Sequence, residues 1–428
     1  MNLSESFQLI LATGIFITTY AIIISEKINR TTIAFFGAVL MVLFKIIGLE
    51  KAFEVIDFHT IGLLIGMMII VNIIKKTGAF QYIAIKSAKL TKGNPWHILL
   101  MLSTITAISS ALLDNVTTVL LIAPVTLVIT EALKVSPIPF MVSEILAANI
   151  GGTATLIGDP PNIMIGSETG LGFMDFLLNL FPVVAVIYIV TLFLIKVIYK
   201  PQLHVQETLK MKIMDFDEQL ALTDKKLLVK SLWVLGFTIL GFGLHQFIGI
   251  ETATVALAGA SVLLLISKAD PEEIFQEIEW LTIFFFAFLF ILVGTLEEIG
   301  VIETIAKAVI RITKGDLVFT GLLILWISGV ASAFLDNIPF VATMIPLINS
   351  IGRLSSINIT PLWWALALGA CLGGNGTLVG ASANVVVAGI LEKHKHKISF
   401  AQYMKVGFPL MIVSIIISTV YLYLFYFM

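Results

Sequence analysis

Charged residues and cysteine are both scarce in this sequence of 428 residues. Only 13% of the residues are Asp, Glu, Lys or Arg, whereas soluble globular chains carry about 25%. This scarcity excludes an ordinary soluble domain, and a formal net charge of −2 implies no nucleic-acid partner. The single cysteine, Cys371, excludes an intrachain disulfide and a cysteine-based metal site.

Apolar residues dominate what remains. They make up 58% of the chain, and the mean hydropathy is +1.03. Apolar runs of about 20 residues recur along the chain, which is the length that crosses a bilayer. We therefore expect an all-α polytopic membrane protein embedded in lipid. The first run lacks a charged n-region and a cleavage signal, so we expect it to remain as a membrane helix.

Two glycine-rich stretches lie 222 residues apart and share a pattern. They read GGTATLIGDPPN at 151–162 and GGNGTLVGASAN at 373–384. The same offset carries the pair Asp114-Asn115 onto Asp336-Asn337. Because this register holds over more than 100 residues without gaps, we infer an internal duplication.

Each half contains two interrupted apolar segments. Proline and glycine prevent an unbroken membrane helix, and freed backbone groups are tolerated at membrane depth only inside protein or beside a wet cavity. We therefore predict broken helices over 138–166 and 361–391. The segments 97–133 and 318–350 carry an Asp-Asn pair near the middle, and we predict that each forms a re-entrant helical hairpin with that pair at its tip.

Re-entrant hairpins leave five spanning helices in each half, and an odd number inverts the second half relative to the first. This topology places 20 of the 26 Lys and Arg residues on the side of the central linker, which the positive-inside rule assigns to the cytoplasm. Counting each hairpin as two spans would leave the halves parallel. The prediction is a multi-pass protein of the cell membrane with both termini outside, built from an inverted repeat at 1–200, a cytoplasmic linker at 201–230 and a second repeat at 231–428.

Inverted repeats with broken helices bind ions and substrates near the midplane. Carboxylate, amide, hydroxyl and carbonyl oxygens suit a small cation such as sodium, so we expect sodium sites at Asp114/Asn115 and Asp336/Asn337. The predicted ion ligands are Asp114, Asn115, Thr117, Gly151, Gly152, Thr155, Asp336, Asn337, Gly373, Gly374, Asn375 and Thr377. The residues expected to face the transported species are Thr118, Asp159, Asn162, Ser382 and Asn384.

A second interpretation of several of these residues is helix capping, which Asp, Asn and Ser favour. Acids in apolar surroundings are nevertheless functional candidates. Glu144 and Asp159 are candidate proton carriers because burial disfavours a charged carboxyl group; pairing with a neighbouring helix is the alternative for Glu144. We expect no Lys or Arg beside the four acids Asp114, Glu144, Asp159 and Asp336, which favours cation or proton coupling.

Four motifs resemble the ion transporter superfamily, and the resemblance covers essentially the whole chain. The superfamily includes the arsenite permease ArsB, NhaD-type sodium/proton antiporters, sodium-coupled dicarboxylate transporters and the P-protein branch, to which this sequence is most similar. The resemblance implies a scaffold plus a transport domain, usually in a homodimer, that move by an elevator-like displacement. The motifs are DNVTTVLLIAPVT at 114–126, NIGGTATLIGDPPNI at 149–163, DNIPFVATMIP at 336–346 and ALGACLGGNGTLVGASANVVVAGI at 367–390.

The hairpin tips depart from the dicarboxylate branch of this superfamily. That branch carries Ser-Asn-Thr at its tips, whereas the tips here read Leu-Asp-Asn. We expect a secondary active transporter that moves a small ion or small anionic solute by alternating access, with sodium or protons as the coupling ion and no cofactor. A sodium/proton antiporter proper and a passive anion channel are the alternatives. Enzyme activity is not expected, since no nucleophile–base pair or His-x-x-x-His cluster occurs.

Overall fold

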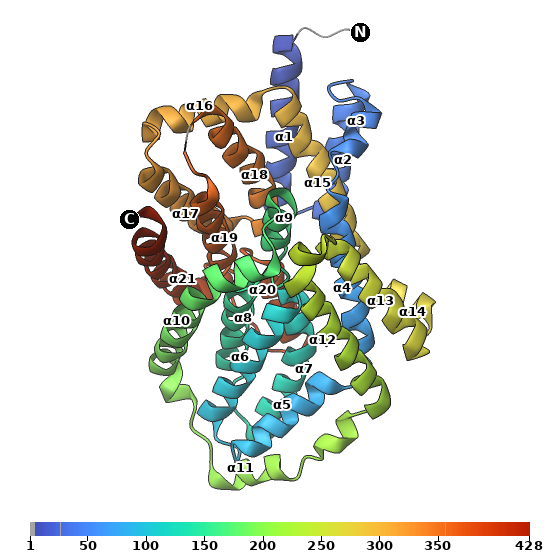
Figure 1. Cartoon of the computed structure of the whole chain (residues 1–428). Coiled ribbons are helices and arrows are strands. Elements are labelled where there is room, and N and C mark those ends of the chain that lie inside the picture. Colours follow the sequence, from blue (N-terminus) through green and yellow to red (C-terminus); the bar gives the residue numbers. More distant parts are fainter. Residues whose placement is uncertain (1–4, 26, 356) are drawn as a thin grey trace.

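Helices account for all the regular structure in the computed structural model over the residues it describes, 5–25, 27–355 and 357–428 (Figure 1). Within these ranges, nine helices are long and apolar enough to cross a membrane. The predicted all-α polytopic membrane fold is thereby confirmed. The first ten helices are α1 (Glu5–Ser25), α2 (Arg30–Leu43), α3 (Leu49–Glu54), α4 (Phe58–Lys75), α5 (Ala79–Leu90), α6 (Pro95–Leu112), α7 (Asn115–Leu133), α8 (Ile138–Thr153), α9 (Pro160–Thr169) and α10 (Phe173–Tyr199).

The segment after α10 is partly helical. It holds α11 (Glu207–Met214) between the 3-10 turns Lys200–Gln202 and Glu218–Ala221. The next helix begins at Lys225, inside the predicted linker 201–230, because the Asp224 side chain caps it by accepting from the backbone N–H groups of residues 226 and 227.

The second half runs through ten further helices and ends in a π-helical turn, Tyr423–Phe427. The helices are α12 (Lys225–Ile248), α13 (Thr252–Ser267), α14 (Pro271–Gln276), α15 (Trp280–Glu298), α16 (Val301–Thr313), α17 (Leu317–Phe334), α18 (Asn337–Leu354), α19 (Thr360–Gly373), α20 (Ser382–Lys393) and α21 (Phe400–Leu422).

The offset seen in the sequence also relates the helix bounds. Adding 222 to the bounds of α6 gives those of α17, and adding it to α3 gives α14. Neither α3 nor α14 is predicted from the sequence, so this correspondence is independent of the motifs. The two halves therefore present the same order of elements.

The helices divide into two groups by their contacts. The scaffold helices, α1–α4 and α12–α15, pack mainly on one another, and so do the hairpin helices, α6–α10 and α17–α21. In Figure 1 the scaffold helices α4, α13 and α14 lie on one side, and α10, α17 and α21 lie on the other. The related helices α5 and α16 lie at opposite ends of the molecule.

Gly66 lets two scaffold helices approach closely. A Cβ atom at Gly66 of α4 would lie 2.7 Å from the carbonyl carbon of Ala256 in α13, whereas one at Gly62 would meet only side chains at 3.4–3.5 Å. The first distance is a clash with backbone, and the second is ordinary van der Waals contact. The α4–α13 packing thus depends on Gly66 more than on Gly62.

We therefore expect Gly66→Ala to lower the free energy of unfolding by about 1–3 kcal/mol, the usual range for overpacking. Gly62→Ala is the matched control, with no loss expected because alanine favours the helix. Thermal unfolding of the two purified variants measures the difference. Equal melting temperatures would contradict this account of the α4–α13 contact.

Candidate functional site

Each hairpin turns at an Asp-Asn pair whose aspartate caps the helix that follows. Asp114 accepts a hydrogen bond from the backbone N–H of Thr117 at 2.8 Å. Asp336 accepts one from the backbone N–H of Ile338 at 3.2 Å. Each cap uses Oδ1, which leaves the second carboxylate oxygen available to another partner. Capping and ligand binding are therefore compatible at both tips.

The two helix breaks are closed by asparagine side chains. The Asn162 amide donates to the carbonyl oxygens of Gly152, Thr153 and Thr155 at 3.4, 3.2 and 2.8 Å. In the second half, the Asn384 amide donates to the carbonyls of residues 374 and 377 at 2.7 and 2.8 Å. Asn162 and Asn384, predicted to face the cargo, thus pair the backbone carbonyls that the breaks release.

Other residues of each break pack against, or donate hydrogen bonds to, the first helix of the neighbouring hairpin. A Cβ atom at Gly151 would lie 2.1 Å from a carbonyl oxygen of α6, and one at Gly373 would lie 2.5 Å from a carbonyl oxygen of α17. The hydroxyls of Thr155 and Thr377 donate to carbonyls of α6 and α17 at 2.5 Å. These four predicted ion ligands hold each break beside its hairpin in this conformation.

An amide network joins the first tip to the second break. Asn115 donates to Oδ1 of Asn149 at 3.1 Å, and Asn149 in turn donates to Oδ1 of Asn375 and Oδ1 of Asn384 at 3.0 Å each. All four asparagines are buried. Asn149 was absent from the predicted site, although it lies within the motif at 149–163. The hydrogen bond from Asn149 to Asn384 connects α8 with α20, which are far apart in the sequence.

The second tip contacts the first break through Asp159. The Asn337 amide donates to both carboxylate oxygens of Asp159, at 3.2 and 3.3 Å. Asp159 precedes α9, but its side chain makes no capping hydrogen bond. Its carboxylate therefore contacts the tip of the second hairpin instead of capping α9.

Both tips line one small cavity of about 30 Å³. This volume holds one or two water-sized groups. Five of the predicted residues take part: Asp114, Asn115, Asp159, Asn337 and Ser382. The full lining is Arg30, Leu64, Met68, Asp114, Asn115, Val116, Asp159, Pro160, Glu279, Thr282, Asn337, Ile338 and Ser382.

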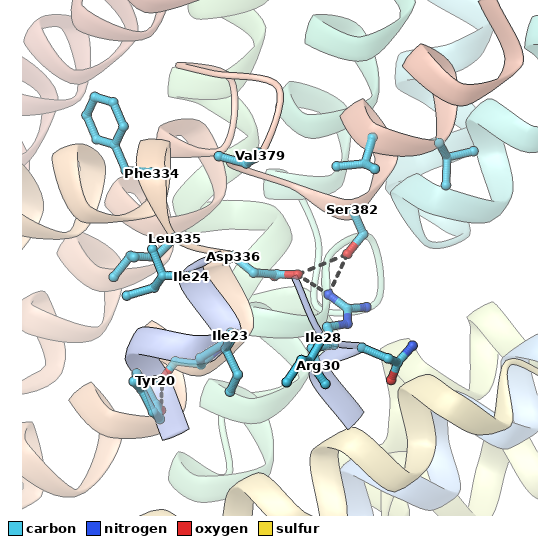
Figure 2. A pocket seen from close by; sticks show the side chains of 14 residues that line it. Tyr20, Ile23, Ile24, Ile28, Arg30, Phe334, Leu335, Asp336, Val379 and Ser382 are labelled. Carbon is cyan, nitrogen blue, oxygen red and sulfur yellow. Dashed lines mark hydrogen bonds and ion pairs between the residues drawn. The ribbon is translucent and has the colours of Figure 1, made fainter. Parts of the chain in front are cut away.

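Arg30 overturns the expectation that no basic side chain lies beside the acids. Its Nη1 donates to Oδ2 of Asp336 and to the Ser382 hydroxyl, the latter at 2.9 Å. Figure 2 shows these side chains at the wall of a second cavity, of about 400 Å³, lined mainly by apolar residues. Arg30 and Asp336 are 306 positions apart, so no local sequence pattern could place one beside the other.

Glu279 is a second residue of the site that was not predicted from the sequence. It precedes α15, accepts a hydrogen bond from Thr282 at 3.1 Å and lines the small cavity with Asp114. A signal existed, because the 222-residue offset maps Glu279 onto Asp57, another acid just before a helix. The cavity thus brings three carboxyl groups together with one guanidinium group.

The other predicted residues lie outside the lining of this cavity, among them Thr117, Thr118 and Glu144. Thr117 contributes its backbone N–H to the cap of α7, and the Thr118 side chain is buried. Glu144 is also buried, and its Oε1 accepts a hydrogen bond from Thr126 of α7 at 2.5 Å. This contact is the pairing with a neighbouring helix named above as the alternative for Glu144.

Comparison with known proteins places this arrangement in a family. The family model described as citrate transporter, CitMHS, matches residues 20–369. The chain belongs to the CitMHS family. It is 42% identical over 98% of its length to a transporter of Mycobacterium bovis, and the match covers 99% of that protein. It is 36% identical, again over 98% of its length, to the human P protein, of which the match spans 60%.

Two solved structures share the fold of this CitMHS member. The YdaH transporter of Alcanivorax borkumensis aligns over 97% of both chains with a TM-score of 0.60 and 11% identity. MtrF of Neisseria gonorrhoeae aligns over 90% of this chain and 84% of its own, with a TM-score of 0.62 and 14% identity. The resemblance to the ion transporter superfamily is confirmed, and the protein is a multi-pass membrane transporter.

The closure of the breaks by asparagine can be tested by truncation. We expect Asn162→Ala and Asn384→Ala each to lower the free energy of unfolding by about 1–3 kcal/mol, because buried carbonyls lose their donor. Asn349→Ala is the matched control, since the half-buried Asn349 side chain donates to the exposed Glu168. Thermal unfolding measures the loss, and three variants of equal stability would contradict the assigned role.

Proposed function

We propose that this CitMHS transporter is a secondary active transporter that moves a small ion or small anionic solute, with sodium or protons as the coupling ion. The observation that carries the proposal is the meeting of both hairpin tips and both helix breaks around one small cavity. Residues from both halves face a single volume, so displacing one group of helices changes access to it. Such a centre is what alternating access requires.

The charges around the cavity support cation or proton coupling. Asp114, Asp159 and Glu279 line the cavity together with one guanidinium group, and carboxylates close to one another disfavour each other's charged form. Protons or a bound cation would offset the excess negative charge. The same excess disfavours a passive anion channel and a cargo with three negative charges such as citrate, whereas a sodium/proton antiporter proper agrees with it.

Relative displacement of the scaffold and hairpin helices is the proposed movement. The helices of each group pack mainly on one another, and side-chain hydrogen bonds such as the one from Ser167 of α9 to Asp57 before α4, at 2.9 Å, link the two groups. The placement of α5 and α16 at opposite ends of the molecule supports inverted repeats (Figure 1). Together with the inverted repeats, we propose that the linker is cytoplasmic, that both termini are external and that the protein lies in the cell membrane. From the family resemblance we also propose a homodimer.

Flux into proteoliposomes tests the function. We expect counter-flow that responds to an imposed sodium or proton gradient, and we expect Asp114→Asn to reduce it at least about tenfold because the cavity loses a charged ligand. Glu303→Gln, an exposed change on α16, is the control. Flux that dissipates any gradient without exchange would instead indicate a channel. Full activity of Asp114→Asn would contradict the assignment of this cavity.

A disulfide between the two helix groups tests the displacement. The Asp57 and Ser167 side chains are short and their oxygens are 2.9 Å apart, so Asp57→Cys with Ser167→Cys places two thiols close together. We expect oxidation to stop transport and reduction to restore it. The single-cysteine variants are the controls, since the native Cys371 is buried. Undiminished transport by the cross-linked protein would exclude a movement between α4 and α9.

A further inference from the structure

Arg30 occupies the point where the two cavities and the two helix groups meet. It is the first residue of α2 in the scaffold, whereas its partners Asp336 and Ser382 belong to the hairpin helices. Arg30 and Ser382 line both the 30 Å³ cavity and the 400 Å³ cavity. The arginine side chain therefore both joins the two groups and stands between the two cavities.

The partners of Arg30 form a ligand set that would also suit a small metal cation. The Ser382 hydroxyl donates to Oδ2 of Asp336 at 3.0 Å, and the same two oxygens contact Arg30 (Figure 2). Carboxylate and hydroxyl oxygens are hard ligands of the kind sodium prefers. The guanidinium group thus lies where an ion bound by Asp336 and Ser382 would lie.

We propose that Arg30 is a tethered cation that sodium replaces at Asp336, and that this exchange releases the scaffold helix α2 from the tip of the second hairpin. The inference rests on the proposed function, because it assigns the coupling ion and its release step to the same site. In the absence of sodium, Arg30 neutralises Asp336 and holds the two groups together. With sodium bound, the carboxylate stays neutralised and the hairpin helices are free to move.

The pair is accessible enough for such an exchange. The side chains of Arg30 and Asp336 are 28% and 14% exposed, in contact with the larger cavity. Partly exposed ion pairs contribute little net stability, so a competing cation can replace one member. A fully buried pair would resist exchange because a charge would be left without a partner.

Arg30 also has partners on its own side of the contact. Its guanidinium carbon lies 5.0 Å from the centroid of the Phe285 ring in α15, a cation–π distance. Glu279, at the start of α15, lines the small cavity together with Arg30. The scaffold can therefore retain the arginine after it leaves Asp336.

The first hairpin lacks the equivalent cation. The 222-residue offset maps Arg30 onto Thr252, Asp336 onto Asp114 and Ser382 onto Pro160. In this register both tips carry an aspartate, whereas the positions of Arg30 and Ser382 are held by Thr252 and Pro160 in the other half. Because of this asymmetry, the exchange of Arg30 for sodium is expected at the second hairpin tip and not at the first.

Sodium-dependent thermal stabilisation of the purified full chain tests the exchange. Choline chloride keeps the ionic strength constant, and the sodium concentration that gives half the maximal shift is measured. If Arg30 occupies Asp336 in about nine-tenths of the molecules, Arg30→Gln should lower that concentration about tenfold. Arg30→Lys should fall between Arg30→Gln and wild type, because lysine keeps the charge without the planar fork. Asp336→Asn should remove or strongly weaken the shift.

Lys27→Gln is the matched control, since it removes an exposed positive charge three residues before Arg30 and should leave the sodium midpoint unchanged. A wild-type midpoint in Arg30→Gln, or a higher one, would overturn the exchange while leaving the proposed transport intact. An unchanged shift in Asp336→Asn would likewise place sodium elsewhere. No sodium shift in the wild type would overturn the exchange together with sodium coupling.

Discussion

Backbone carbonyls cannot remain unpaired inside a membrane protein, and this requirement organises the centre of the fold. Each break releases carbonyl groups that a continuous helix would have used. Asn162 and Asn384 donate to them from the helix that follows each break. Because these amide-to-carbonyl hydrogen bonds fix the conformation of each break, the side chains at the start of α9 and α20 are directed toward the hairpin tips. The polar cavity follows from this pairing.

The duplicated framework carries different chemistry in its two halves. Asp159 of the first break corresponds to Ala381, and Asn149 corresponds to Cys371. The first tip therefore meets an amide in Asn149, whereas the second meets a carboxylate in Asp159. Such a difference allows the two tips to take different parts in the proposed transport. The shared glycines and threonines maintain the framework, and the unmatched residues distinguish the two tips.

The sequence predicted the architecture well because its signals are local or periodic. Apolar runs, the Asp-Asn pairs and the 222-residue register identified the membrane helices, the segments that become the hairpins and both breaks. Short helices such as α3 were missed because six residues carry too little periodicity. Arg30 was missed for another reason: its partner is 306 positions away, and only tertiary packing brings α2 to the second tip. The roles of Asn162 and Asn384 likewise depend on which carbonyls their amides reach.

The proposed transport requires the hairpin helices to move as a group against the scaffold helices. Spin labels at Ser261 of α13 and Glu392 of α20, both exposed, would report the distance between the two groups in lipid. A second pair at Glu392 and Lys405, within the hairpin helices, would serve as the internal reference. We predict two distance populations for the first pair, with a ratio that changes with sodium or pH, and one for the reference pair. A single distance between α13 and α20 under all ionic conditions would contradict the account.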